Sequence, residues 1–187
     1  TAIEWLRKQS KQTLLQSETY NYTTYKSSFI NVNPFHDYVN DVQRYQKPVA
    51  KPFTKLSFAE KMLQLEKSLD TIKTNDAKAK VYYQLASAYY NMSYYGNSWM
   101  AVSYYRPNTL WNTGNYKADW EKEYFGVQRA KDYYTKAYEL TTTNKEFKAA
   151  AYFLIAKCEQ RQVLSPEYDW NNYEAYESKL KVFQKKF

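Results

Sequence analysis

Aromatic rings and polar side chains concentrate between residues 96 and 126 of this 187-residue chain. A flat ring can cover an apolar face of a ligand, while amide, carboxylate and guanidinium groups orient the ligand through hydrogen bonds. This combination is typical of a site for a peptide or a sugar. The competing interpretation is that these rings pack together to keep a long segment ordered. We predict ligand contacts from six side chains: Trp99, Tyr105, Arg106, Trp111, Tyr116 and Trp120.

Two groups of carboxylates raise the question of hydrolase chemistry. They are Asp119, Glu121 and Glu123, and later Glu167 and Asp169. A glycosidase needs two carboxyl groups about 5–10 Å apart across a cleft. Residues that follow one another on a single helix or loop do not enclose a cleft, so we interpret these acids as solvated. The sequence gives no positive support for an enzyme.

Histidine and cysteine each occur once, as His36 and Cys158. Neither has a second histidine or cysteine at the spacing of a metal site, and no serine or cysteine lies in a recognisable nucleophile motif. Cys158 lies within an apolar helical pattern, which predicts a buried structural thiol. We therefore expect no internal disulfide, no metal site and no cofactor.

Tyrosine dominates the composition with 22 residues, whereas glycine and proline occur only three and five times. So few turn-forming residues argue against a β-sandwich or barrel. The formal net charge is +8, but no arginine-rich arm or recognised nucleic-acid motif accompanies it, so we expect solvated basic faces and no nucleic-acid partner. No apolar run reaches the roughly 18–20 residues of a membrane span. The clearest basic cluster is Lys179, Lys181, Lys185 and Lys186.

Hydrophobic spacing predicts a series of helices along the chain. Ser57 and Glu60 form the pattern of a capping box at the start of the third of them. Pro48 and Pro52 favour extended backbone just before it, and this is the best boundary in the chain. The predicted helices cover residues 3–17, 37–46, 58–72, 77–94, 127–140, 147–162 and 170–187.

Two stretches resemble each other: KTNDAKAKVYYQLASAYY at 73–90 and TTNKEFKAAAYFLIAKCEQ at 142–160. With one gap, Tyr82 corresponds to Tyr152 and Leu85 to Ile155, and Ala86 corresponds to Ala156. Each stretch follows a predicted helix, so the chain contains two similar helix–turn–helix corners. Internal repeats of this kind are typical of helical solenoids.

The helices of these corners resemble tetratricopeptide repeats. Tyr82-x-x-Leu85-Ala86-x-x-Tyr89 is similar to the first helix of such a repeat, and Ala130-x-x-x-Tyr134-x-x-Ala137 to the second. Small residues at a helix crossing allow close approach, while large residues fill the grooves beside it. The two helices are separated by about 32 residues more than in a regular repeat, so a long insertion, roughly residues 96–126, interrupts this hairpin.

A narrower resemblance covers more of the chain. The NPF at 33–35, TKLSFAEKML at 54–63, YYNMSYYGNS at 89–98 and AKDYYTKAYEL at 130–140 together resemble large uncharacterised envelope proteins of Bacteroidetes. The resemblance implies a tetratricopeptide-like part of a longer lipoprotein or exported protein, located in the cell envelope. It implies no enzymatic activity.

These patterns predict an all-α fold of irregular tetratricopeptide-like antiparallel helix pairs, an α–α superhelix with an aromatic-rich insertion in one hairpin. We expect residues 1–53 to pack onto a repeat region at 54–187. The predicted function is a non-enzymatic interaction module that binds a protein or peptide, acting by surface complementarity. The alternative is a carbohydrate-binding module of an envelope system for glycan uptake.

Overall fold

The protein is built from α-helices in a computed structural model that describes residues 1–10, 13–14, 33–37, 53–103, 119–163 and 173–186. No β-strand is assigned within these ranges, and the prediction of an all-α chain is confirmed. A short 3₁₀ turn, η2, covers Trp99–Ala101. The helices are α1 (Ala2–Arg7), α3 (Lys55–Thr71), α4 (Asn75–Met92), α5 (Asp119–Gly126), α6 (Gln128–Leu140), α7 (Lys145–Val163) and α8 (Tyr173–Lys186).

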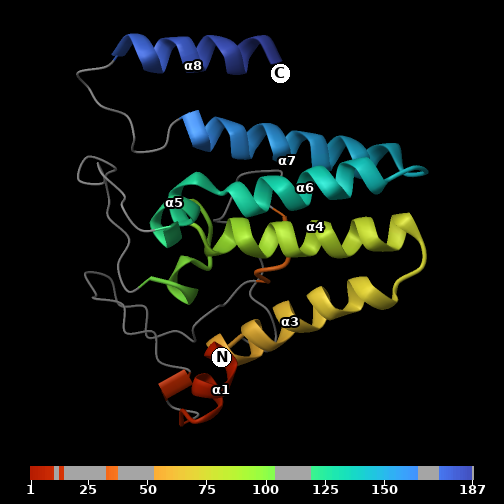
Figure 1. The fold of residues 1–187 in the computed structure, drawn as a ribbon, viewed down its shortest axis with the longest axis vertical. Coiled ribbons are helices and arrows are strands. Elements are labelled where there is room, and N and C mark those ends of the chain that lie inside the picture. The colour runs from red at the N-terminus through yellow and green to blue at the C-terminus, as the bar shows by residue number, and fades with distance from the viewer. Residues whose placement is uncertain (11–12, 15–32, 38–52, 104–118, 164–172, 187) are drawn as a thin grey trace.

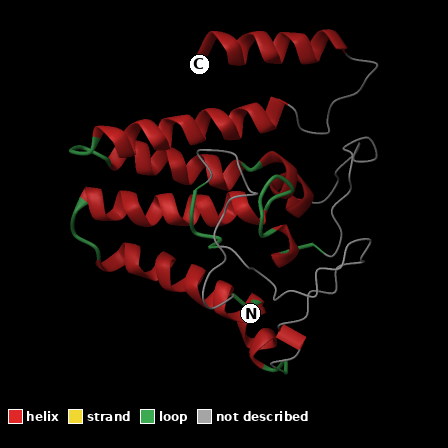
Figure 2. Cartoon of the chain, turned by 180° about the vertical axis from the view of Figure 1, so that it is seen from behind, coloured by secondary structure: helices red, strands yellow, loops and turns green. Residues whose placement is uncertain are grey.

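Helices α3, α4, α6, α7 and α8 lie beside one another in chain order, and each runs antiparallel to the one before it (Figure 1). The closest packing joins α4 to α6 and α6 to α7. At the far end of the row, α8 stands apart from α7 and lies only beside its C-terminal part (Figures 1 and 2). The fold therefore has a tightly packed centre and a loosely covered end.

Alanine permits the close approach at the centre. Ala86 of α4, Ala130 and Ala137 of α6, and Ala151 of α7 are all fully buried. Small side chains let the backbones come close, while Tyr134 of α6 fills the space between them. Its hydroxyl lies 3.0 Å from that of Ser87, so the polar atom that it buries is satisfied.

Cys158 belongs to the same core and is fully buried, as predicted for a structural thiol. Burial raises the pKa of the Cys158 thiol well above its usual value, because the thiolate would lose its hydration.

Threonine residues begin the two long helices on the N-terminal side of the core. Thr54 caps α3, and Ser57 is the third residue of that helix: its Oγ accepts from the Thr54 N–H at 2.9 Å while its own N–H donates to Thr54 Oγ1. The predicted capping box at Ser57 and Glu60 is therefore three residues too late. Thr54 offers the same hydroxyl chemistry one turn earlier, and Glu60 instead pairs with Arg7 of α1 at 2.9 Å.

A carboxylate joins the two similar corners. Asp76, in the first turn of α4, accepts from the Thr142 N–H at 3.0 Å and from Thr143 Oγ1 at 2.7 Å. The hydrogen bond from the Thr142 backbone is the main cause that lowers the pKa of Asp76. The α3–α4 and α6–α7 corners thus lie side by side at one edge of the row.

The helix predicted over residues 3–17 is interrupted. Helix α1 ends at Arg7 with Lys8 as its C-cap, residues 8–10 are not helical, and residues 13–14 are helical again. Trp5, expected beside the packing residues, is 69% exposed and carries the Lys8 ammonium 4.8 Å above its ring. Helix α1 contacts α3. Of the helix predicted over residues 37–46, only Asp37 lies among the described residues, and it is not helical.

The NPF segment forms a turn that is fixed to α4. Asn33 Oδ1 accepts from the Phe35 N–H at 3.0 Å, which is an Asx turn. The amide of Asn91, on α4, donates to the carbonyls of Pro34 and His36 at 2.9 and 3.0 Å. The ring centroid of Phe35 lies 5.3 Å from that of Phe58 of α3. One buried amide therefore attaches a distant segment to the central helix.

Candidate interaction surface

Four of the six predicted contact residues, Tyr105, Arg106, Trp111 and Tyr116, lie outside the described residues. The other two lie in different surroundings. Trp99, in η2, packs against a buried aromatic cluster, whereas Trp120 of α5 is 60% exposed. These two rings differ so much in burial that only Trp120 presents an open aromatic surface.

The buried cluster lies where both ends of the segment 96–126 meet. It consists of Tyr94, Tyr124 and Phe125, with ring centroids 4.9 Å apart for Tyr124–Phe125 and 5.3 Å for Tyr94–Phe125. The Tyr94 N–H also donates to the Tyr124 carbonyl at 2.9 Å. At its two ends, therefore, the segment uses its rings for packing, which is the competing interpretation of its composition.

The joint between α5 and α6 is strained. Val127 has a φ of 47°, in the left-handed region that β-branched residues avoid, and its side chain is 1% exposed. It offers no side-chain cap to α6, and Glu123 takes that role: its Oε1 accepts from the Arg129 N–H at 2.8 Å. Burial raises the pKa of Glu123. Glu123, interpreted from the sequence as a solvated acid, is half-buried and caps α6.

Tyrosines on the other side of α4 and α6 form a strip with two cations. The ring centroid of Tyr133 of α6 lies 5.6 Å from that of Tyr82 and 5.5 Å from that of Tyr89, both on α4. Arg129 lies over the Tyr89 ring, and Lys136 lies 5.3 Å from the Tyr82 ring. Cation–π contacts already occupy these ring faces, so the strip stabilises the helix pair and is not an open aromatic platform.

An open face appears on α7 when the two similar corners are compared. On α4, Tyr83 is 8% exposed because the rings of Phe147 of α7 and Tyr134 of α6 lie 4.7 and 5.3 Å from its own, and the neighbouring Tyr82 packs on Tyr133. The corresponding positions of α7 are Tyr152, whose ring lies 5.5 Å from that of Tyr138 of α6, and Phe153; these two side chains are 44% and 47% exposed. Helix α8 follows α7 as α6 follows α4, but it does not cover these rings. The face of α7 that carries Tyr152 and Phe153 is called here the open α7 face.

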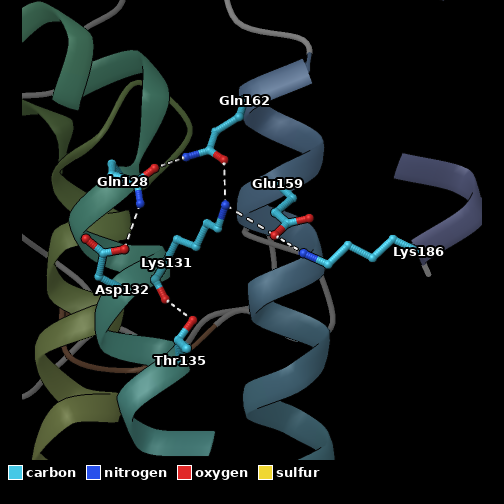
Figure 3. Close-up of polar contacts among 7 residues, drawn as sticks. All are labelled: Gln128, Lys131, Asp132, Thr135, Glu159, Gln162 and Lys186. Carbon is cyan, nitrogen blue, oxygen red and sulfur yellow. Dashed lines mark hydrogen bonds and ion pairs between the residues drawn. The ribbon is translucent and has the colours of Figure 1, made fainter. Parts of the chain in front are cut away.

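A groove of about 540 Å³ lies between α6, α7 and α8. At its floor, Lys131 of α6 and Lys186 of α8 approach one carboxylate from opposite sides (Figure 3). Glu159 Oε1 lies 3.2 Å from Lys131 Nζ and 2.6 Å from Lys186 Nζ. Lys131 also donates to Gln162 Oε1 at 3.1 Å. The groove is lined by Lys131, Glu159, Gln162, Ser178, Val182, Phe183 and Lys186.

The Glu159 carboxylate is ionised at neutral pH. Burial alone would raise its pKa, but the hydrogen bonds from Lys186 and Lys131 outweigh that effect, so the pKa is lowered. Protonation at low pH removes the charge that holds the two ammonium groups together. This ionic contact joins α8 to α7.

No group of three or more metal-ligating side chains occurs within the described ranges. Among the described helices, none is long and apolar enough to cross a membrane.

The described residues form an all-α fold with half-exposed rings on α7 and a groove between α6, α7 and α8. Searches among protein families, curated proteins and solved structures found no match to the chain. The tetratricopeptide-like architecture and the envelope location therefore remain predictions.

The repeat comparison matched Tyr152 to Tyr82, and each of these rings packs on a tyrosine of α6, at 5.5 Å from Tyr138 and 5.6 Å from Tyr133. The comparison did not single out the exposed Phe153. The position of Phe153 could have indicated the open α7 face, because Phe153 directly follows Tyr152 and corresponds to Tyr83 of α4. A pattern of this kind shows which residues are equivalent, but burial depends on whether the following helix actually covers them.

Proposed function

We propose that this chain is a non-enzymatic protein-interaction module of the tetratricopeptide-like class, and that the open α7 face binds an α-helix of another polypeptide. The contrast between Phe153 at 47% exposure and Tyr83 at 8% carries the proposal. On α4, rings of α6 and α7 cover Tyr83, and an antiparallel helix packed on α7 would cover Phe153 in a similar way.

A synthetic peptide with the sequence of α6, residues 128–140, tests this proposal because α6 is the helix that covers the equivalent face of α4. We expect it to bind the protein with a dissociation constant in the micromolar to millimolar range, measured by fluorescence anisotropy. Phe153→Ser should weaken binding about tenfold, since burying a phenylalanine contributes about 1.5–3 kcal/mol. Val102→Ser is the control, because Val102 is 52% exposed elsewhere on the surface.

Two results would contradict the proposal. One is equal affinity of the peptide for the parent protein and for Phe153→Ser. The other is a concentration-dependent dimer in sedimentation equilibrium that Phe153→Ser dissociates, which would make a second copy of the chain the occupant.

The resemblance to Bacteroidetes envelope proteins supports a further part of the proposal, that the module belongs to a larger exported protein or lipoprotein of the cell envelope. Cell fractionation with an antibody against the chain tests this location. Recovery in the cytoplasmic fraction alone would contradict it.

Carbohydrate binding is the second candidate function, and the exposed indole of Trp120 favours it. Trp120→Ala should change the free energy of unfolding by less than about 0.5 kcal/mol, because the side chain is 60% exposed. Phe125→Ala, on the same helix but 6% exposed, should cost about 3–5 kcal/mol. On a glycan array, binding by the parent chain that Trp120→Ala abolishes would support this candidate, and an empty array would contradict it.

A further inference from the structure

Helix α8 is enclosed much less than the helices of the central core. Among the α8 side chains whose exposure the structure describes, at positions 177–178 and 180–186, none is buried. Helix α6, in contrast, buries Ala130, Tyr134 and Ala137. Because the burial of apolar side chains is the main contribution that holds one helix on another, α8 is held more weakly than α6.

The contact of α8 with the helices beneath it is also incompletely filled. A groove of about 540 Å³ remains between α6, α7 and α8, and Val182, which lines it, is still 68% exposed. Well-packed interiors leave few voids larger than a water molecule. The described members of the central core cluster belong to α4, α6, α7 and the α5–α6 joint, and none belongs to α8. Helix α8 can therefore leave α7 without opening that core.

Two side-chain pairs mark a continuous seam between α6 and α7. One is Tyr138 with Tyr152, whose ring centroids lie 5.5 Å apart, and the other is Lys131 with Glu159 at 3.2 Å. In each helix the two positions are seven residues apart, so the pairs lie on one side of the helices and about 10 Å apart along them. Lys186 of α8 contacts the second pair, and the groove is lined by that pair and not by the two tyrosines.

We infer that α8 is a cover that opens as a unit while the central helices stay folded, and that its opening exposes the end of the seam at Lys131 and Glu159. The contact between Glu159 and Lys186 favours the closed position. The 14 residues of α8 are too few for a stable helix in water, so α8 loses its helical hydrogen bonds once it leaves α7. The inference goes beyond the proposed function and does not depend on it, because the opening is a property of this chain alone.

Native-state hydrogen exchange of the whole chain, followed by NMR, tests the opening. Relative to their intrinsic rates, the amides of residues 178–186 should exchange at least about a hundredfold faster than those of residues 151–158 in α7. They should nevertheless remain at least about fivefold protected, and they should share one protection factor, because a single opening releases them all.

Three results of this measurement would overturn the inference. Protection of α8 equal to that of α7 would mean that α8 opens only with the core. Absence of protection would mean that α8 does not cover the seam. A gradient of protection that decreases steadily toward residue 186 would mean that the helix frays from its end and does not open as a unit.

A pair of variants tests the role of the Glu159 contact. Glu159→Gln should lower the protection of α8 about two- to fivefold and leave that of α4 unchanged, as expected for the loss of a partly exposed ion pair. Asp132→Asn is the matched control: it removes the same charge from α6, but Asp132 accepts from Gln128 at 2.7 Å and does not line the groove (Figure 3). It should change the protection of α8 less than about 1.5-fold.

Equal effects of the two variants would overturn the role of the Glu159 contact, because net charge would then account for the change. An equal loss of protection in α4 and α8 would overturn the separate opening, because the whole fold would then open together. These measurements need no binding partner. Their failure and the failure of the α6 peptide to bind are therefore distinct results.

Discussion

Gly96→Ala should destabilise the protein by about 3 kcal/mol or more, the largest effect that we expect from a single methyl group. A Cβ placed on Gly96 would lie 2.2 Å from both the Cα and the carbonyl oxygen of Asn91. These are backbone atoms of the central helix, so no side-chain rotation can relieve the clash. The same carbonyl accepts from the Ser98 N–H at 2.8 Å, and moving it would also weaken that bond.

Thermal unfolding followed by circular dichroism measures this effect. A loss of about 3 kcal/mol in a chain of this size corresponds to a decrease in Tm of about 6–12 °C. Gly126→Ala is the matched control, because a Cβ there meets no atom within 4 Å and its φ is not positive. That variant should be neutral or slightly more stable, by up to about 1 kcal/mol. Equal Tm values for the two variants would disprove the close approach at Gly96.

Asn91→Ala should cost about 2–4 kcal/mol. The amide of Asn91 is 1% exposed and donates to two carbonyls of the NPF segment. Its removal leaves the buried Pro34 carbonyl without this donor, and an unsatisfied buried polar group costs about 1–3 kcal/mol. The lost bonds also release the turn that holds Phe35 against Phe58.

Denaturant unfolding with a fitted midpoint gives this value. The control is Tyr83→Phe on the same helix, which removes one hydrogen bond to the same segment, from the Tyr83 hydroxyl to Asp37 Oδ2 at 2.9 Å. That bond is part-buried, and we expect its loss to cost about 1 kcal/mol. If Asn91→Ala costs no more than Tyr83→Phe, the attachment of the segment depends on its apolar contacts alone.

The spacing of apolar residues along the sequence predicted the helices well wherever those residues also pack in the tertiary structure. The helix predicted over 77–94 is observed as Asn75–Met92, and the one over 58–72 as Lys55–Thr71. Both contain apolar residues at helical spacing, and threonines cap both. The helix predicted over residues 3–17 is interrupted at Lys8, whereas Leu14 fits the helical spacing and is itself helical.

The candidate site was predicted less well, for a physical reason. The aromatic residues of a segment could bind a ligand, but they could equally well form a packed core. Of the two predicted rings within the described residues, Trp99 packs on a cluster and Trp120 is exposed. Composition cannot distinguish these cases, because burial depends on partners such as Tyr94 and Phe125 that come from opposite ends of the segment.

The sequence by itself determined the all-α class, the buried thiol of Cys158 and the equivalence of the two corners. These properties follow from the spacing of apolar residues within single helices. The tertiary structure alone decided that Tyr83 is enclosed while Phe153 is open, and that Lys131 and Lys186 meet at Glu159. Both depend on where a separate helix lies, since α6 covers α4 closely and α8 leaves much of α7 uncovered.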